Sequence, residues 1–469
     1  MNKVFNKIFL IFNKKDKKRV FYLILLMILT ALFEILGIGS IMPFLSVISN
    51  SEIIYENYYL FGIFKFLNFK REINFLIFLG CTSIFLILIS SFIRAYTNFK
   101  KFNLTFNFTN EISQKLLKSY LEKPYSFFIY RNNSEITKII LSETDLVSNQ
   151  AILPTLNLIS SSIFALFVFI FLIIVDPLLA FLIILFFGAF YFLMFLAFRK
   201  YLGRIGKQRN VENSLRFKLI SEILGGIKVI KILGNEKIYL DSFSKPSYKY
   251  SILSSRSKVI SEIPQYLVEV AAFGALIAIT MYTLINEGNN IQFILPKLGL
   301  YALSSLKLKP IINNIYKAIT TLKFGAPALD NIIEDLHTSE KNLDPLNNNK
   351  IHFNDKLILK NISFKYTGAT NASILNLNIE IKKKSTLGII GLTGSGKSTL
   401  VDIILGLLKP SKGQIFLDDL KLDHNNMRHW QNMIGYVPQD IFLAEDTLIK
   451  NIAFGVDSNS IDMKKVIKD

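Results

Sequence analysis

The chain has 469 residues, of which 51% are hydrophobic and 41 are phenylalanine, and its formal net charge is +19. This composition lies outside the range of soluble globular proteins and predicts a membrane domain. The single cysteine and the four histidines disfavour a disulfide framework and a metal site. The positive charge could indicate nucleic acid, but lysine and arginine usually flank membrane spans on the cytoplasmic side, and no basic and aromatic RNA-binding pattern accompanies the charge, so we expect no nucleic-acid partner.

The first predicted element is a short amphipathic helix over residues 1–19, lying on the inner membrane surface. Apolar residues alternate there with lysines and precede a basic cluster, Lys14, Lys15, Lys17, Lys18 and Arg19. This pattern is typical of an interfacial helix. The following apolar run continues to Ile48 without a small-residue cleavage pattern, so we expect a retained span rather than a removed secretion signal.

Six apolar stretches approach or exceed the ~20 residues that a membrane span requires. They cover residues 20–48, 73–97, 151–175, 177–199, 264–286 and 291–322. Spans three and four are joined by a turn at Asp176–Pro177 and spans five and six by residues 287–290, whereas the other two inner connections are long, basic and compatible with helix. The positive-inside rule places both long connections and both termini in the cytoplasm. We therefore expect an α-helical six-span transmembrane domain over residues 20–324.

From residue 325 the sequence becomes polar and contains proline and asparagine, which predicts a linker over residues 325–350. Beyond it, apolar residues alternate with polar ones in two successive stretches, which contain Ile362, Phe364 and Tyr366, and then Leu375, Leu377, Ile379 and Ile381. Two half-buried strands in succession predict an α/β domain over residues 351–469 that opens with an antiparallel sheet.

The stretch GLTGSGKST, residues 391–399, matches the phosphate-binding pattern G-x-x-x-x-G-K-[ST]. We expect residues 386–390 to form a strand before this loop and residues 398–408 to form a helix after it, ended by Lys409–Pro410. The glycines let the backbone wrap around phosphates, and the helix N-terminus meets their negative charge. The expected ATP contacts in this stretch are Gly391, Gly394, Ser395, Gly396, Lys397, Ser398 and Thr399.

Within that set, Lys397 is expected to reach the β and γ phosphates, and the Ser398 hydroxyl is expected to ligate Mg²⁺. Two further motifs accompany the loop, NISFKYTG with Tyr366 before it and IGYVPQD with Gln439 after it. This pairing resembles the ATPase domain of ABC transporters, and the continuation IFLAEDTLIKNIAFG is similar to their exporter branch. The resemblance implies that Tyr366 stacks on adenine and that Gln439 contacts Mg²⁺. An exposed strand aromatic remains the alternative for Tyr366.

Six spans, two long cytoplasmic connections and a C-terminal P-loop nucleotide-binding domain together resemble an ABC exporter half-transporter. The resemblance implies a second half as partner, which we expect to be an identical chain. It also implies a short coupling helix in each long connection, within Leu121–Ile136 and between Arg209 and Leu224. For the aromatic residues of the first stretch, Tyr125, Phe127, Phe128 and Tyr130, ordinary packing is the alternative.

Residues 16–49 and 401–419 resemble bacterial flippases of lipid-linked oligosaccharides of the PglK type. The resemblance implies a substrate cavity whose cations meet a lipid-linked pyrophosphate, with Arg94 in FIRAYTN and Lys307 in LKLKP at two of those positions. Gln265 stands where a third cation would be expected. The aromatic loop over residues 51–72 is expected to engage the lipid tail, or to form an interfacial aromatic belt.

Ionisable groups inside spans are costly, so each of them is a functional hypothesis. Arg94, Lys307 and Lys309 could all supply cations to a central cavity. The alternatives are that Arg94 reaches the inner surface and that span six ends before Lys307. Three acidic residues could offset this positive charge, namely Glu34, Glu262 and Glu269.

The printed chain shows no signature loop, catalytic carboxylate pair or switch histidine after Gln439, and Asp418 and Asp419 come too early to be that pair. We therefore expect a truncated protein that holds no catalytic residue and does not hydrolyse ATP as written, whereas the completed protein is an ATP-driven exporter of the inner membrane. The alternatives are a non-catalytic membrane subunit that acts through a complete partner, and an exporter of simple lipids, peptides or drugs.

Overall fold

A computed structural model describes residues 7–8, 12–175, 177–287, 291–337, 351–439 and 441–462. The chain divides into two compact units. A helical unit comprises residues 1–123 and 127–340, and a nucleotide-binding unit comprises residues 124–126 and 341–469. Each unit is described on its own below.

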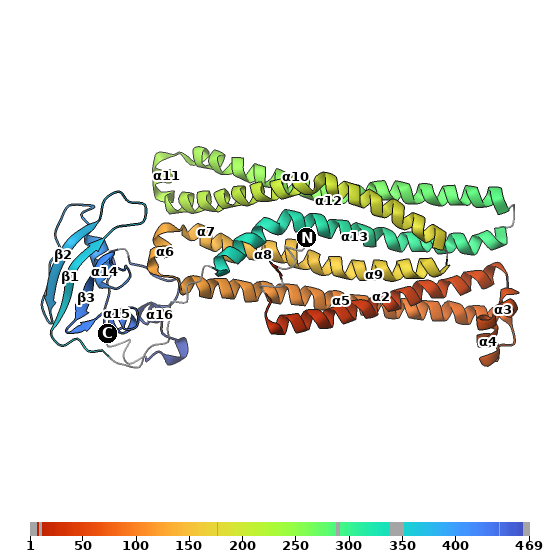
Figure 1. Ribbon diagram of the computed structural model, residues 1–469, viewed down its shortest axis with the longest axis horizontal. Helices are drawn as coiled ribbons and strands as arrows, with labels where there is room; N and C mark the ends of the chain where they lie inside the picture. Colours follow the sequence, from red (N-terminus) through yellow and green to blue (C-terminus); the bar gives the residue numbers. More distant parts are fainter. Residues whose placement is uncertain are drawn as a thin grey trace. The chain divides into compact units, whose positions relative to one another are not determined.

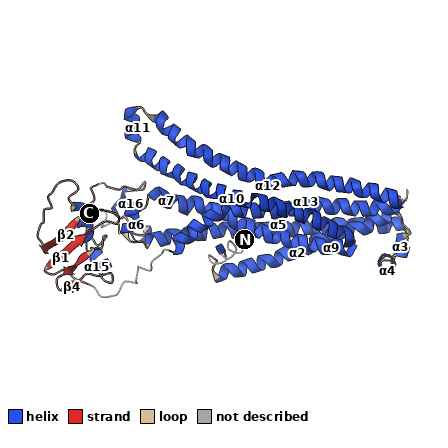
Figure 2. Ribbon diagram, turned by 45° about the horizontal axis from the view of Figure 1, so that its top comes forward, coloured by secondary structure: helices blue, strands red, loops and turns tan. Residues whose placement is uncertain are grey.

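Long helices that run alongside one another build the helical unit (Figure 1). They are α2 (Lys14–Ser49), α5 (Glu72–Leu121), α9 (Leu153–Val175), α10 (Pro177–Gly225), α12 (Glu236–Glu287) and α13 (Ile291–His337). Helix α2 packs along α5, and α9 packs along α13. Helices α10 and α12 pair with each other and diverge from the rest toward the loop that carries α11 (Ile227–Leu233), as Figure 2 shows.

Among the described residues, three segments are long and apolar enough to cross a membrane, Lys14–Ser49, Glu72–Leu121 and Asn133–Ile174. They coincide with predicted spans one to three. Predicted spans four to six fall on the helical backbones of α10, α12 and α13, where many side chains lie outside the described residues. A total of six spans therefore stays a prediction, and so do the two turns at residue 176 and residues 288–290.

The main core of the helical unit joins α2, α5, α9 and α13, and it also takes up the described part of the N-terminal segment. Ile8 and Phe12 are buried in this core, and the ring of Phe12 meets the ring of Phe108 edge-on at 4.4 Å. Lys7 forms an ion pair with Asp330 at 2.6 Å. For the described residues of this segment the arrangement differs from the expected helix on the membrane surface, because Ile8 and Phe12 are buried against the bundle instead. Helix α2 also begins at Lys14, inside the predicted segment.

Helix α13 continues through the first half of the predicted linker and ends at His337. The physical reason is burial, since Ala328, Leu329 and Ile332 are fully buried at helical spacing in the main core. Within the described part of the predicted linker, Asp330 and Glu334 are exposed, whereas Asp335 is buried and accepts a hydrogen bond from the Tyr120 hydroxyl. The expected boundary at residue 325 is therefore wrong, and residues 338–350 lie outside the described part.

Five short segments connect α5 to α9: α6 (Tyr125–Tyr130), α7 (Asn133–Thr137), α8 (Thr144–Val147) and the π-helical segments η1 (Lys138–Glu143) and η2 (Ser148–Ile152). Two glycines allow this region to pack tightly. A Cβ atom on Gly206 would collide with the Phe324 carbonyl group, and a Cβ atom on Gly325 would lie 2.6 Å from the Cβ of Gln150. The segments η2, α10 and α13 therefore meet at backbone contact.

The short helices in the two long connections only partly match the prediction. Helix α6 lies within the expected stretch Leu121–Ile136, and its Phe127 packs on Tyr120 with ring centroids 5.9 Å apart. The expected second stretch, from Arg209 to Leu224, lies inside the continuous helix α10. The separate short helix is α11, which begins after Gly226 and ends at Gly234 in the left-handed conformation with φ of +65°.

Two short helices, α3 (Ile53–Glu56) and α4 (Tyr58–Phe66), occupy the aromatic loop between α2 and α5. Ile54 and Leu60 anchor them in a small core with Phe75. Tyr58 and Phe66 are exposed by 86% and 87%. The segment therefore combines an anchored side with a strongly exposed aromatic side.

The nucleotide-binding unit opens with an antiparallel sheet, as the alternating pattern predicted. Its strands are β1 (Lys356–Phe364), β2 (Ile374–Lys382), β3 (Lys412–Leu417) and β4 (Leu420–Lys421), in the order β2-β1-β3-β4. Leu359 is fully buried and pairs with Ile379 on β2 and with Ile415 on β3. Three further helical segments are α14 (Lys397–Ile404), α15 (Met427–Gln431) and α16 (Leu448–Ile452), and η3 spans Ser458–Ser460.

Two predictions about the flanks of the phosphate loop are wrong. Residues 386–390 form no strand, and Ile390 is 97% exposed. A strand requires a hydrogen-bonded neighbour, and none of the strands in the described part pairs with these residues. Helix α14 ends at Ile404 rather than near Pro410, because Gly406 adopts the left-handed conformation with φ of +69° that commonly ends helices.

Asp418 lies in the turn between β3 and β4, at the edge of the sheet. It adopts a left-handed φ of +53°, which aspartate tolerates better than most residues. Its carboxylate accepts backbone hydrogen bonds from Asn354, Asp355 and Lys356 at 2.8 to 2.9 Å. These bonds lower the pKa of the Asp418 carboxyl below its usual value. The residue therefore fastens the start of β1 to the β3–β4 turn.

Candidate functional site

The phosphate loop, residues 391–398, adopts a backbone that depends on its glycines. Gly394 and Gly396 have φ values of +82° and +91°, in the left-handed region that other residues rarely adopt. A Cβ atom on Gly396 would lie 2.6 Å from the carbonyl oxygen of Ser373, just before β2. The loop therefore passes too close to the sheet for any side chain at this position, and it leads directly into the N-terminus of α14.

Lys397 is the first residue of α14 and folds back over the loop. Its ammonium group donates hydrogen bonds to the carbonyl oxygens of Gly391 and Leu392, both at 2.8 Å. Ser398 follows on the exposed side of the same turn. The structure thus brings the predicted lysine, serine and glycines together at one helix N-terminus, where backbone N–H groups favour anions.

Tyr366 lies beside the first turn of α14. Its hydroxyl oxygen is 3.0 Å from the Thr399 hydroxyl oxygen, and its ring meets the ring of Phe364 edge-on at 4.9 Å. Gln439 is exposed in the irregular segment after α15. The described contacts therefore join Tyr366 to the first turn of α14, whereas none of them joins Gln439 to the loop or to α14.

The residues of this loop fit the triphosphate of ATP. Two glycines in the left-handed conformation, a lysine at the loop and a hydroxyl on the first helical turn are the donor set that phosphates and Mg²⁺ require. Bound ATP with Mg²⁺ would supply a transferable γ-phosphoryl group at this site.

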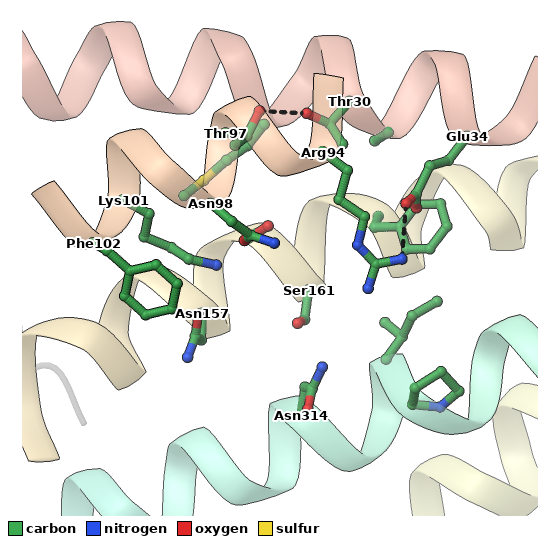
Figure 3. Close-up of a pocket in the computed structure, with 16 residues that line it drawn as sticks. Thr30, Glu34, Arg94, Thr97, Asn98, Lys101, Phe102, Asn157, Ser161 and Asn314 are labelled. Atoms are coloured by element: carbon green, nitrogen blue, oxygen red, sulfur yellow. Dashed lines mark hydrogen bonds and ion pairs between the residues drawn. The ribbon is translucent and has the colours of Figure 1, made fainter. Parts of the chain in front are cut away.

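A second candidate site is a polar cavity of about 300 Å³ inside the helical unit, formed by α2, α5, α9 and α13 (Figure 3). Arg94 on α5 and Glu34 on α2 form an ion pair across it, with 3.1 Å between Nη1 and Oε1. The Glu34 side chain is buried, whereas that of Arg94 is 55% exposed. Close by, the hydroxyl oxygens of Thr30 and Thr97 lie 2.8 Å apart and join the same two helices.

Polar side chains from the other helices complete the lining. They are Asn98 and Lys101 from α5, Asn157, Ser160 and Ser161 from α9, and Asn314 from α13. Sequence reasoning found Arg94 and Glu34 but missed all of these. The available indication was spacing, because Arg94, Thr97, Asn98 and Lys101 recur at intervals of three, four and seven residues on one helix face.

The other residues predicted for the cavity either have side chains outside the described part or form ion pairs and hydrogen bonds elsewhere. The side chain of Lys307 lies outside the described part, so its place in the cavity stays a prediction. Lys309 forms an ion pair with Glu269 at 2.8 Å, and it is not among the residues that line the cavity. Glu262 is similarly paired with Lys317 at 3.7 Å, and Gln265 accepts a hydrogen bond from Asn313 at 2.8 Å. These groups join α12 to α13.

Both parts of the chain match known protein families. Residues 19–293 match the ABC transporter transmembrane region, and residues 374–468 match the ABC transporter domain that contains the phosphate loop. The chain belongs to the ABC transporter family. The P-loop unit of this transporter is therefore an ABC ATPase domain and binds ATP, and the helical unit is the membrane domain.

The transporter is similar to several curated lipid A-core flippases. It is 28% identical to the ATP-dependent lipid A-core flippase of Wigglesworthia glossinidia brevipalpis over 73% of this chain and 58% of the relative. It is 23% identical to the corresponding protein of Ralstonia nicotianae over 76% of this chain and 60% of the relative. The chain spans about half the length of the curated relatives that it matches.

A solved structure shares the fold. The transporter superposes on the structure of a bacterial Atm1-family ABC exporter with ATP bound, with a TM-score of 0.73, covering 96% of this chain and 76% of that one. The sequence identity is 16%, so this likeness concerns the fold alone.

Proposed function

We propose that this protein is one half of an ATP-driven ABC exporter that moves an amphipathic lipid, such as a lipid-linked oligosaccharide, across the bacterial inner membrane. The observation that carries the proposal is the presence, in one chain, of a phosphate loop with its lysine at the start of α14 and a polar cavity inside an apolar helical bundle. Charged and amide side chains within membrane spans are costly and are retained for a function such as substrate passage.

The ATP site supplies the driving force in this proposal. Lys397 leaves the Gly391 and Leu392 carbonyl groups and binds the β and γ phosphates, and Ser398 ligates Mg²⁺. Tyr366 packs on the adenine ring from the side of β1. Gln439 contacts the same Mg²⁺ from the exposed segment, which requires that segment to close over the nucleotide.

The membrane domain supplies the path. The Arg94–Glu34 cavity receives the polar headgroup, while the lipid chains stay in the apolar surroundings of the bundle. Short helices α6 and α11, at the turns of the two long connections, are the elements that transmit movement from the ATPase domains. A second, identical chain completes the transporter, with both termini in the cytoplasm.

The test is reconstitution of the completed protein, with the rest of its ATPase domain, in proteoliposomes with a fluorescent lipid-linked oligosaccharide in one leaflet. ATP-dependent appearance of the label in the other leaflet is the expected result, and it disappears in Lys397→Ala. The matched control is Lys409→Ala, an exposed lysine just beyond α14.

Two results would contradict the proposal. Equal translocation with and without ATP would remove the driving force, and translocation of plain phospholipid but not of the glycan-bearing lipid would replace the substrate class. An ABC exporter of peptides or drugs would show neither lipid activity, and its ATP turnover would respond to those compounds instead.

A further inference from the structure

Helix α6 is too short to hold its own position. It has six residues, Tyr125–Tyr130, and none of their side chains is buried. An isolated helix of this length is not stable in water, so the place of α6 depends on its contacts with neighbouring elements. The chain itself joins α6 to the end of α5, because residues 122–124 are all that separate the two helices. A link from α6 to the other long helices has to come from side chains.

Three side chains supply such a link, and we call Tyr120, Arg131 and Asp335 the Asp335 clamp. Arg131 follows α6 directly, and its guanidinium group donates hydrogen bonds to both carboxylate oxygens of Asp335 on α13, at 2.7 and 3.1 Å. Tyr120, the last residue but one of α5, donates its hydroxyl hydrogen to the same carboxylate at 2.8 Å. The side chains of Arg131 and Asp335 are 21% and 9% exposed. One carboxylate therefore joins α5, α13 and the chain that leaves α6.

The geometry of the Asp335 clamp fixes orientation as well as distance. A planar guanidinium group that meets a carboxylate through two hydrogen bonds holds both groups in one relative orientation. The guanidinium group of Arg131 also lies over the rings of Tyr120 and Phe127, at 5.8 and 5.4 Å from their centroids. Phe127 belongs to α6. Arg131 therefore connects α6 to α13 through a ring contact on one side and an ion pair on the other.

Both helices that the clamp joins continue to the polar cavity. Asn314 of α13 lines the cavity and precedes Asp335 by 21 residues (335 minus 314) of the same helix. At 1.5 Å per residue this separation is about 32 Å along the helix axis. Helix α5 reaches the same cavity through Arg94 and Lys101. The clamp therefore connects the ends of two of the four helices that form the cavity.

We propose that Arg131 and Asp335 are positioning residues for transport, through which a movement of α6 reaches α13 and the wall of the cavity. This proposal rests on the proposed function, because it takes α6 as an element that receives movement from the ATPase domains. Without the clamp, α6 stays attached to α5 but moves independently of α13. ATP hydrolysis then continues, while fewer of its cycles change the shape of the cavity.

The test compares ATP hydrolysis with translocation of the fluorescent lipid-linked oligosaccharide, in proteoliposomes that contain the completed protein. Asp335→Asn removes the negative charge and keeps the size of the side chain. We expect this variant to retain ATPase activity and to move about tenfold fewer lipid molecules per ATP hydrolysed, because the loss of one charge-assisted hydrogen bond shifts an equilibrium by about that factor. Asp330→Asn is the control on the same helix, since Asp330 pairs with Lys7 at side chains that are 55% and 37% exposed. The control is expected to keep the wild-type ratio.

An exchange of charges separates this role from a contribution to stability alone. Arg131→Asp is expected to lower the ratio as Asp335→Asn does. Arg131→Asp combined with Asp335→Arg restores a pair of opposite charges and is expected to recover the ratio, a gain that loss of fold cannot produce. An unchanged ratio in Asp335→Asn, or a loss of ATPase activity in proportion to translocation, would overturn the proposal.

Hydrogen–deuterium exchange of the same proteins tests the clamp without any lipid substrate. Addition of ATP and Mg²⁺ to the wild type is expected to change the exchange of the α13 backbone amides around Asn314. We expect Asp335→Asn to abolish this change and Asp330→Asn to keep it. An equal change in all three proteins would refute the clamp and leave the proposed function standing. A change that depends on Asp335, without ATP-driven translocation by the wild type, would refute the proposed function alone.

Discussion

Lys138 and Glu143 form an ion pair, with 3.3 Å between Nζ and Oε1, at a place where their side chains are 3% and 0% exposed. Both residues belong to the π-helical segment η1. Lys138 also donates a hydrogen bond to the Ser214 hydroxyl at 2.7 Å, which connects η1 to α10. The fully buried Arg209 lies on the same helix and stacks on the ring of Phe324 at 4.9 Å.

The first prediction concerns this pair. Lys138→Met leaves the buried Glu143 without its partner, and we expect a loss of about 3–5 kcal/mol in stability, typical of breaking a buried ion pair. Thermal unfolding of the purified protein measures the loss. Lys218→Met removes one partner of the pair with Glu222, whose side chains are 53% and 57% exposed, and is expected to change stability by no more than about 1 kcal/mol. Equal losses in the two variants would contradict a special role for burial.

The second prediction tests the backbone contact between α10 and α13. Gly206→Ala places a methyl group against the Phe324 carbonyl, and we expect a destabilisation of about 1–3 kcal/mol because the backbone cannot move aside cheaply. Gly188→Ala is the control on the same helix, since a Cβ atom there meets nothing within 4 Å. The midpoints of thermal unfolding distinguish the variants. A Gly206→Ala protein as stable as Gly188→Ala would show that the helices are able to separate.

The third prediction is a dependence of stability on pH. Three backbone hydrogen bonds lower the pKa of Asp418 in the folded state. Its contribution to stability is therefore fully present above the unfolded-state pKa of about 3.9 and is lost as the pH falls through the lower folded-state pKa. Asp418→Asn is expected to reduce stability at neutral pH and to flatten the acid limb of the unfolding profile. Asp419→Asn, at an exposed neighbour, is expected to leave that limb unchanged. A wild-type acid limb in Asp418→Asn would contradict the prediction.

The fourth prediction separates stacking from hydrogen bonding at Tyr366. Tyr366→Phe removes the contact with the Thr399 hydroxyl and keeps the ring, so we expect ATP affinity to change little. Tyr366→Ala removes the ring and is expected to weaken ATP binding by about 1–3 kcal/mol, the usual contribution of an aromatic ring to base stacking. Phe454→Ala, at an aromatic residue beyond α16 that is 69% exposed, is the control. Calorimetric titration with ATP gives the affinities, and equal losses in the two Tyr366 variants would assign the effect to the hydroxyl group.

Local patterns predicted the parts of the molecule that depend on local chemistry. The phosphate loop was predictable because the residues that shape it, Gly394, Gly396 and Lys397, follow one another closely in the sequence and need no distant partner. The β1–β2 pair was predictable because apolar and polar residues alternate along both strands, which indicates that each strand has one buried face. Periodicity could not identify Ile390 as an exposed loop residue, since an apolar run indicates a strand only where a neighbouring strand pairs with it.

The cavity was only partly predictable for a different reason. Arg94 and Glu34 were visible in the sequence as charges in apolar spans, but their pairing follows from the packing of α2 against α5, and the polar residues of α9 and α13 that complete the lining follow from the packing of the bundle. The second short connecting helix was misplaced in the same way. Basic residues such as Arg209 suggested a connection, whereas Arg209 is fully buried inside α10 and the chain turns only near Gly226.

The π-helical segments η1 and η2 also have a consequence for insertions and deletions. In a regular α-helix of 3.6 residues per turn, the loss of one residue rotates everything that follows by about 100°. A π-helical turn holds one residue more than an α-helical turn, so a single deletion there converts the wide turn to an ordinary one and leaves the later faces in place. Residues 138–143 and 148–152 are therefore the points where this bundle can change its length without turning Asn157 and Ser161 away from the cavity.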